Sequence, residues 1–374
     1  MSQKYFAVTT PGLEQALHDE LRALRTRKRV ILKGGVEFEA TNKGFYQAVY
    51  HSRVANRIYL RLDSFRAKDT YELHRKSKRF AWERVLPPGC EVALEATTRR
   101  SKRKGTGEIE NTVLYGIQDH FKELGETPPT RAHEFDNTPF RLLVRLEDNR
   151  CTLSIDAAGR SMHQRGWRQE IGRAPLRENV ACALLNLIGW KPGVPLLDPM
   201  CGAGTFVIEA ARMHKGLPPR QWSDYAFHHW ANFQSETWEK IVAETSEPVE
   251  GELALAGSDN NKGIIGISER NAERAEITEE VSFQLRQAQA IMPHSENPGF
   301  VVLNPPYGAR LPRFSQTELD MFTQFIKHFP GWTMGMLMPE AAKPEFDGLH
   351  FEELTAFRNG GMPVRFWKIQ AEPS

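Results

Sequence analysis

From about residue 175 onward, apolar segments alternate with amphipathic ones, and this alternation is the feature that most restricts what the chain can fold into. Apolar runs end at Asp198, Ser258 and Leu303, and each is followed, directly or after a loop, by a segment with helical spacing. Strands connected through helices pair in parallel, because each helix carries the chain back to the same edge of the sheet. This half is therefore predicted to be α/β, with a mostly parallel sheet and helices on both faces.

The N-terminal half has a different pattern. The first 40 residues predict a strand, a helix and two further strands, over residues 5–10, 13–24, 30–32 and 35–38. Residues 54–165 continue the mixture and end in a predicted hairpin. A chain of 374 residues is too long for a single core. We therefore expect at least one α+β unit in front of the α/β domain.

Basic and acidic residues are divided unevenly along the chain. Residues 1–165 contain 30 Lys and Arg against 21 Asp and Glu, whereas residues 166–374 contain 19 against 26. The two parts therefore carry +9 and −7, which together give the net charge of +2. A basic N-terminal part attracts a polyanion, so the charge distribution favours nucleic acid as a partner.

A glycine-containing loop follows the first predicted strand of the α/β half. Residues 196–206 read L-L-D-P-M-C-G-A-G-T-F, so an apolar strand leads into the loop and a helix begins at Thr205. Glycine allows a tight turn and lets a ligand approach the helix N-terminus closely. Val207 stands where dinucleotide-binding loops carry their third glycine, which disfavours a nicotinamide dehydrogenase. Asp198 repels a pyrophosphate but attracts an ammonium group, which favours S-adenosylmethionine as the ligand.

The next predicted strand ends at Asp259, the position where a nucleoside site in this type of fold needs a carboxylate for the ribose hydroxyls. Asp259 can also cap the helix that starts near Lys262, and the two roles are compatible. Because the glycine loop precedes it, we favour ribose binding.

The segment Asn304–Gly308 reads N-P-P-Y-G and directly follows a predicted strand. The Asn304 side-chain oxygen and the Pro305 carbonyl can accept the hydrogens of an exocyclic base amine and localise its lone pair toward a methyl donor. The two prolines stiffen the loop and offer no N–H, while Tyr307 offers a flat face for a base taken out of its helix. A rigid surface turn is the alternative, but a position at the end of a strand favours a ligand site.

Residues 97–105 read T-T-R-R-S-K-R-K-G and form a loop between a predicted strand and a predicted helix. Five cations in six positions are suited to contact phosphate groups without reading the bases. A solvated loop is the alternative. We predict RNA contacts from Arg99, Arg100, Lys102, Arg103 and Lys104.

Other features exclude several classes of protein. His228 and His229 lack a third ligand at useful spacing, so we expect a structural role for them and no metal. The four cysteines form no C-x-x-C pair, which argues against disulfides and a zinc knuckle. No apolar run approaches the roughly 18 residues of a membrane helix, and the first ten residues lack a secretory signal. These features predict a cytoplasmic protein that does not contact a membrane.

In combination, D-P-M-C-G-A-G-T, the strand-end carboxylate and N-P-P-Y-G resemble the motifs of class I methyltransferases that act on base amines. Residues 52–58 (S-R-V-A-N-R-I), residues 81–83 (A-W-E) and the basic tract resemble a THUMP domain preceded by a ferredoxin-like segment. Residues 173–179 (R-A-P-L-R-E-N) are similar to the helix that opens the methyltransferase domain and lines its cofactor pocket. The resemblance covers nearly the whole chain.

The resemblance implies a Rossmann-like class I methyltransferase domain at 166–374, a ferredoxin-like segment at 1–45 completed by 151–165, and a THUMP RNA-binding domain at 46–160. It implies a catalytic role for Asn304, Pro305, Pro306 and Tyr307, and RNA contacts by Arg53 and Arg57. The implied cofactor-binding residues are Asp198, Pro199, Met200, Cys201, Gly202, Gly204, Thr205, Asp259, Asn260, Gln287, Ala288 and Glu178.

Two positions depart from the family's pattern. Asn260 and Asn261 stand where the family carries an apolar residue that packs on adenine. Gln287 stands where the family has an Asp that accepts a hydrogen bond from the adenine amine, and the Gln carbonyl can accept it without the charge. We therefore expect adenine binding to be weaker or slightly shifted.

The function that the resemblance implies is N2-methylation of guanosine in structured RNA, with S-adenosylmethionine as the cofactor. The first expected substrate is 23S rRNA and the second is tRNA, and the enzyme is expected to be a monomer. Adenine-N6 methylation of DNA or RNA is the main rival, because N-P-P-Y serves that chemistry as well. A catalytically weak RNA-binding relative is the remaining alternative.

Overall fold

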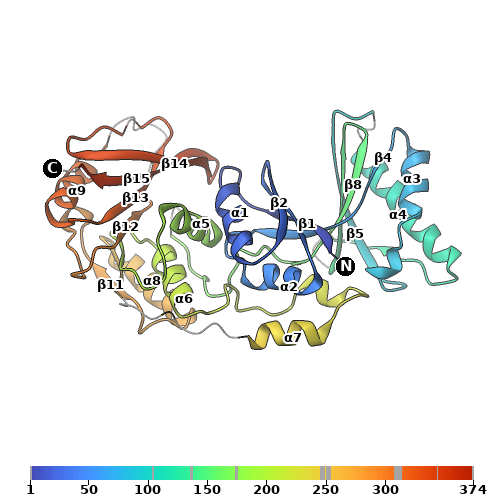
Figure 1. Ribbon diagram of the computed structural model, residues 1–374, viewed down its shortest axis with the longest axis horizontal. Coiled ribbons are helices and arrows are strands. Elements are labelled where there is room, and N and C mark those ends of the chain that lie inside the picture. Colours follow the sequence, from blue (N-terminus) through green and yellow to red (C-terminus); the bar gives the residue numbers. More distant parts are fainter. Residues whose placement is uncertain are drawn as a thin grey trace.

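The computed structural model describes residues 2–102, 105–134, 138–172, 176–244, 249, 254–306, 314–342 and 344–372. They form an elongated molecule with two β-sheets, one built from N-terminal and one from C-terminal strands (Figure 1). Among these residues, no helix is both long and apolar enough to span a membrane.

The N-terminal sheet has eight strands in the order β2-β3-β1-β4-β8-β7-β5-β6. Strand β4 pairs antiparallel with β1 on one side and with β8 on the other, so one continuous sheet runs through both predicted N-terminal units. The boundaries at residues 45 and 160 therefore stay predictions, because no break in the sheet marks them. The strands are β1 (Gln3–Val8), β2 (Arg27–Leu32), β3 (Gly35–Ala40), β4 (Arg57–Arg66), β5 (Glu91–Arg99), β6 (Thr130–Arg131), β7 (Phe140–Glu147) and β8 (Arg150–Asp156). The helices are α1 (Glu14–Ala23), α2 (Asn42–His51), α3 (Thr70–Lys78), the short η1 (Trp82–Arg84) and α4 (Thr106–Glu123).

The C-terminal sheet has seven strands in the order β11-β10-β9-β12-β13-β15-β14. The first five are mutually parallel, and β15 runs antiparallel to β13 and β14, so the predicted mostly parallel α/β architecture is confirmed. The strands are β9 (Leu196–Asp198), β10 (Leu255–Asp259), β11 (Ser282–Leu285), β12 (Phe300–Leu303), β13 (Thr333–Pro339), β14 (Leu349–Asn359) and β15 (Met362–Ala371). The helices that connect them include α5 (Glu178–Ile188), α6 (Thr205–His214), α8 (Lys262–Arg274) and α9 (Gln316–His328).

Local sequence explains where several of these helices begin and end. Helix α5 ends at Gly189, whose φ of 90° is the left-handed conformation that glycine adopts without a steric cost. Helix α9 begins at a capping box, in which the Ser315 side chain accepts from the Glu318 N–H and the Glu318 side chain accepts from the Ser315 N–H. These signals are local, which is why the sequence pattern predicts both helices correctly.

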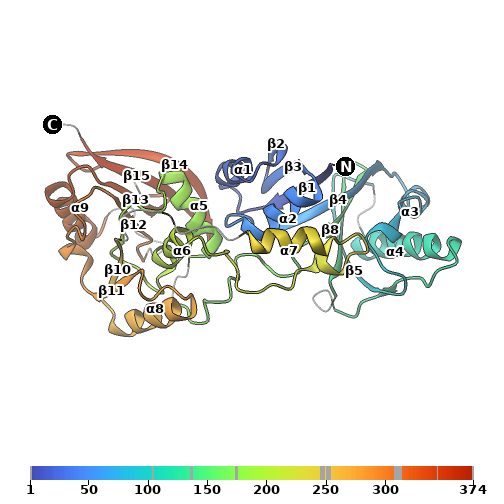
Figure 2. The ribbon, with the colours of Figure 1, turned by 60° about the horizontal axis from the view of Figure 1, so that its bottom comes forward.

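The segment between α6 and β10, rich in tryptophan, leaves the C-terminal sheet and packs against the N-terminal half. It contains η3 (Ala226–His229) and α7 (Ser235–Ala243), and Figure 2 shows α7 running along α2. Trp238 of α7 lies edge-on to Tyr50 at 5.4 Å, and Phe227 stacks on Tyr46 at 4.9 Å. This segment, residues 217–243, is therefore a strap that joins the two halves through buried aromatic rings.

Buried arginines complete the joint between the two halves. Arg220 of the strap donates to the backbone carbonyls of Val49, Tyr50 (2.7 Å) and Ser52 (2.9 Å) at the end of α2. Arg165 and Glu209 form a fully buried ion pair at 3.4 Å. Arginine has enough N–H donors to satisfy several carbonyls at once, so these side chains bind two otherwise separate units into one body.

We expect Arg220→Leu to weaken this joint, because three carbonyls at the end of α2 lose their donor. Leaving a buried acceptor unsatisfied costs roughly 1–3 kcal/mol, so the free energy of unfolding should fall by about 2–4 kcal/mol. Urea unfolding followed by tryptophan fluorescence measures this, with Arg270→Leu as the control because Arg270 pairs with Glu170 at the surface. Equal midpoints for the two variants would show that Arg220 does not hold the joint.

Candidate active site

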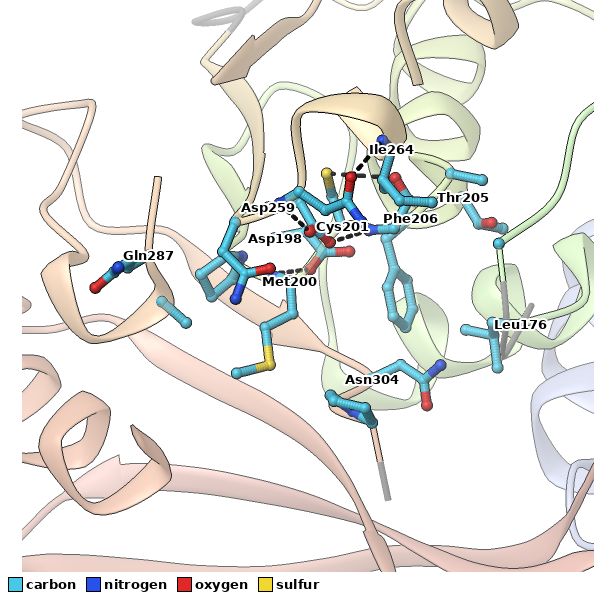
Figure 3. A pocket seen from close by; sticks show the side chains of 18 of the residues that line it. Leu176, Asp198, Met200, Cys201, Thr205, Phe206, Asp259, Ile264, Gln287 and Asn304 are labelled. Atoms are coloured by element: carbon cyan, nitrogen blue, oxygen red, sulfur yellow. Dashed lines mark hydrogen bonds between the residues drawn. The ribbon is translucent and has the colours of Figure 1, made fainter. Parts of the chain in front are cut away.

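Three polar side chains meet at the edge of the C-terminal sheet where the strand order reverses. Asp198 is the last residue of β9, Asp259 is the last residue of β10, and Asn304 directly follows β12. Strands β10, β9 and β12 are parallel neighbours, so their carboxyl ends lie together. A pocket of about 590 Å³ opens there, and all three side chains line it (Figure 3). This is the place where ligands bind in doubly wound α/β folds.

Most of the predicted cofactor-binding residues line this pocket. Gly204 is not among the lining residues but shapes the loop, because its φ is 83° and it is the N-cap of α6. A Cβ at Gly204 would lie 3.1 Å from both Ile208 and Phe283, so a larger residue would strain the turn and crowd its neighbours. The predicted residues that line the pocket are Asp198, Pro199, Met200, Cys201, Gly202, Thr205, Asp259, Asn260, Gln287 and Ala288.

Asp198 is a buried carboxylate, only 2% exposed, and no basic side chain in the described part of the chain balances its charge. Its Oδ1 accepts a hydrogen bond of 3.1 Å from the Met200 N–H. Burial, and to a smaller extent the nearby Asp259 carboxylate, together raise the pKa of Asp198 to about 8. A cationic group bound in the pocket would restore the ionised form. The site is therefore electrostatically prepared for an ammonium ligand.

Asp259 is held by two backbone donors, the Gly202 N–H at 3.2 Å and the Asn261 N–H at 2.9 Å. The capping of α8 belongs instead to Asn261, whose side chain accepts from the Gly263 N–H at 2.9 Å. The alternative in which Asp259 is the helix cap is therefore not what the structure shows. Each oxygen of Asp259 keeps a lone pair for a further donor, as binding of a ribose diol requires.

The N-P-P segment closes the opposite side of the pocket. Figure 3 places Asn304 across the pocket from Asp259, with Met200 between them. Pro306 lines this pocket and also an adjoining hollow of about 210 Å³, whereas Pro305 lines the hollow alone. Tyr307, predicted to stack on the target base, lies outside the residues that the structure describes.

Glu178, predicted to bind the cofactor, is one of the predicted residues that do not line the pocket. It lies buried behind the pocket, 3.4 Å from Arg168. Arg168 does line the pocket, is 7% exposed and donates to the Leu176 carbonyl at 2.6 Å. Its Nε and Nη2 atoms are buried without a hydrogen-bond partner among the described residues. Glu178 thus positions an arginine that offers free donors to an anionic group in the pocket.

Sequence reasoning missed Arg168 and the apolar walls of the pocket. Arg168 belongs to the connector before α5, where the only signal was a cluster of basic residues around Gly166. Ile264 lines the wall beside Asn260, so the apolar surface expected directly after Asp259 comes from the first turn of α8. The remaining lining residues, which were not among the predicted cofactor-binding residues, are Gly172, Leu176, Ala203, Phe206, Asn261, Gln289 and Thr317.

Arg53 and Arg57, which were predicted to contact RNA, form ion pairs within the protein. The Arg53 side chain, 14% exposed, donates to the Leu217 carbonyl and lies 3.7 Å from Glu209. Arg57 pairs with the buried Asp156. Arg53 therefore belongs to the joint between the two halves, and the charge of Arg57 is neutralised within the N-terminal sheet.

The described part of the basic tract lies at the surface, and Arg103 and Lys104 fall outside the described residues. Arg100 pairs with Asp148 at 2.8 Å and Glu147 at 2.9 Å, and the Asp148 carboxylate raises its pKa. Arg99 and Lys102 are exposed.

As expected, His228 packs among aromatic rings, 4.8 Å from the ring of Phe233. Within the described ranges no cluster of His, Cys, Asp or Glu is suited to hold a metal ion.

The raised pKa of Asp198 predicts how stability depends on pH. The folded-state pKa of about 8 lies above the unfolded value near 4, so Asp198 lowers stability progressively as the pH rises from about 4 to 8. Asp198→Asn removes this effect. We expect the variant to be more stable than the wild type at pH 8, by on the order of a few kcal/mol, with a smaller difference at pH 5. Denaturant unfolding at both pH values measures this, and a difference independent of pH would contradict the raised pKa.

Comparison with known proteins agrees with this geometry. Residues 165–338 match the family described as RMKL-like methyltransferase domain, and residues 4–59 match the RlmL ferredoxin-like domain. Two curated relatives, from Methylococcus capsulatus and Psychromonas ingrahamii, are each 31% identical and are named ribosomal RNA large subunit methyltransferase K/L. The alignments cover 100% and 95% of this chain but 52% and 48% of the relatives. The chain thus spans about half the length of these relatives.

A solved structure supports the fold across both halves. The crystal structure of SMU.472 in complex with SAH matches 100% of this chain and 99% of its own, with a TM-score of 0.83 and 22% identity. The predicted combination of a C-terminal α/β methyltransferase domain with a mostly parallel sheet and an N-terminal ferredoxin-like part is therefore confirmed.

Proposed function

Because residues 165–338 belong to the RMKL-like methyltransferase domain family and residues 4–59 to the RlmL ferredoxin-like domain family, we propose that the chain methylates the N2 amine of a guanosine in RNA, with S-adenosylmethionine as the methyl donor. The proposed substrate is 23S rRNA, in line with the relatives' name. The observation that carries the proposal is the single pocket that brings Asp198, Asp259 and Asn304 together.

The chemistry of these residues fits each part of the proposed cofactor. Asp198, buried and without a basic partner, would hold the α-ammonium group. Arg168, with buried unpartnered N–H groups, would hold the α-carboxylate. Asp259 would accept from the ribose hydroxyls, while Ile264 and Ala288 offer apolar contact to the adenine. When bound, the cofactor supplies an electrophilic methyl group on a sulfonium, so no residue of unusual basicity is needed.

Asn304 and Pro305 would orient the base amine. The lone pair of an exocyclic amine is delocalised into the base ring, which makes the nitrogen a poor nucleophile. Acceptance of its two hydrogens by the Asn304 side-chain oxygen and the Pro305 carbonyl would favour a pyramidal nitrogen whose lone pair points into the pocket. The rigid Pro305–Pro306 backbone would hold both acceptors in place without reorganisation.

Asn304→Ala should fold and bind S-adenosylmethionine and RNA, yet transfer methyl groups about 10²–10³-fold more slowly, because one oriented hydrogen bond is lost. Asn304→Asp keeps an acceptor of nearly the same shape, so we expect measurable activity for this control. Single-turnover transfer of labelled methyl to RNA, with chromatographic identification of the nucleoside, measures both. A wild-type rate for the Ala variant would contradict the proposed role of Asn304. N6-methyladenosine as the product would instead support adenine-N6 methylation.

Arg168→Met should weaken S-adenosylmethionine binding by about tenfold to a hundredfold, since a charge-assisted hydrogen bond contributes about 1.5–3 kcal/mol. The control is decarboxylated S-adenosylmethionine, which has no carboxylate and should bind equally to both proteins in calorimetry. If the substitution weakens both ligands alike, Arg168 shapes the pocket and does not contact the carboxylate.

RNA as the partner is supported by the basic N-terminal half and by the exposed Arg99 and Lys102. A tRNA substrate is the second candidate. We further propose a monomer in the cytoplasm, with Arg103 and Lys104 adding phosphate contacts and Tyr307 stacking on the base. Mass spectrometry of RNA nucleosides, fractionated by RNA class from cells with and without the protein, tests the substrate: loss of N2-methylguanosine from 23S rRNA is the expected result.

A further inference from the structure

A second hollow, of about 1010 Å³, lies on the N-terminal sheet and shares no lining residue with the pocket described above. Its walls come from β1, β4, β7 and β8, from the β2–β3 turn and from the segment around η1. Figure 1 shows β4 and β8 well separated from β12, where Asn304 lies. We refer to this hollow as the sheet groove.

The sheet groove carries an excess of positive charge. Eight Lys and Arg residues line it against four Asp and Glu residues. Part of this charge is neutralised locally, because Arg145 and Arg100 pair with Glu147 at 2.6 and 2.9 Å, and Arg61 lies 3.8 Å from Glu37. The excess therefore comes from the remaining cations.

Four cations of the groove have no ion-pair partner among the residues that the structure describes. They are Lys33 in the β2–β3 turn, Arg66 at the end of β4, Arg84 in η1 and Arg150 at the start of β8. All four are exposed, and one acidic lining residue, Asp63, is likewise without a cation partner in the same ranges. Like charges from four separate elements repel one another in one concavity, and a polyanion relieves this repulsion.

Apolar surface lies beside these cations. Leu62 and Phe80 are half-buried in the groove, and Leu32 at its rim is 43% exposed. Cations that follow a backbone, combined with flat apolar side chains, are the means by which proteins bind single-stranded nucleic acid. A duplex keeps the faces of its bases stacked inside, so it could use only the cations.

We propose that the sheet groove binds an unpaired segment of the substrate RNA, with phosphates at Lys33, Arg66, Arg84 and Arg150 and a base against Phe80. Arg100 belongs both to the groove and to the basic tract, so the tract extends the same path of charge. The proposal rests on RNA being the substrate, and it assigns the N-terminal half a docking role at a distance from the methylated base.

The test compares two quadruple variants of the full chain. Lys33→Gln/Arg66→Gln/Arg84→Gln/Arg150→Gln removes the groove cations. The matched control, Arg75→Gln/Lys191→Gln/Lys240→Gln/Lys327→Gln, removes four exposed cations that lie outside the groove and have no ion pair in the described ranges. Fluorescence anisotropy with labelled oligouridine, and with an RNA duplex of equal length, gives dissociation constants between about 50 and 200 mM salt.

Four phosphate contacts at a slope of about 0.7 each account for a factor of about 50 in affinity over this salt range. We therefore expect the groove variant to lose most of its salt dependence for oligouridine while the control variant keeps it. Crosslinking of 4-thiouridine should label the peptide that contains Phe80. Equal slopes for the two variants, or duplex bound as tightly as oligouridine, would overturn the proposal. RNA binding is measured without S-adenosylmethionine, so the two proposals fail separately. If the groove variant shows no change, the proposed methyl transfer is unaffected. If the protein transfers no methyl group, the proposed RNA binding by the groove is unaffected.

Discussion

The buried ion pair between Arg165 and Glu209 is the interaction on which the arrangement of the molecule depends. Both side chains are fully buried, and Glu209 also accepts from the Cys182 thiol at 3.0 Å. Burial alone acts to raise the pKa of Glu209, but Arg165 and Arg53 lower it, so the carboxylate stays ionised. Removal of one partner of a buried pair typically costs about 3–5 kcal/mol, because a lone charge is left in the interior. Arg165 also donates to the Arg53 carbonyl, and Arg53 lies 3.7 Å from Glu209 of α6, so this buried cluster ties the N-terminal half to the C-terminal domain.

Much of the fold can be predicted from the sequence because its signals are local. The C-terminal helices α5 and α6 follow from apolar spacing and from the glycines beside them, and α6 begins at Thr205 as predicted. The strap could not be predicted, because Trp238 packs against Tyr46 and Tyr50 of α2, almost 190 residues earlier in the chain. An aromatic residue in a helical pattern indicates that it is buried but not which surface covers it.

The site residues also divide into those that local sequence predicts and those that depend on distant parts of the chain. Asp198, Asp259 and Asn304 are recognisable because each stands at the end of a predicted strand, and parallel strands bring their ends together. Glu178 and Arg53 occur in family-like motifs, but a motif does not show which way a side chain points. Glu178 pairs with Arg168, and Arg53 pairs with Glu209, because a buried charge without a partner has a high desolvation free energy.

The strap also has a consequence for the order in which the chain is made. Helix α2 leaves the ribosome long before residues 217–243 are synthesised, and until then Tyr46 and Tyr50 lack the rings that cover them. At about 5–20 residues per second, the 187 residues between His51 and Trp238 take roughly 10–40 s to translate. During that interval these two tyrosines leave aromatic surface exposed on α2. Chaperones that recognise exposed aromatic surface therefore have a defined period in which to act on this protein, and that period closes when α7 emerges.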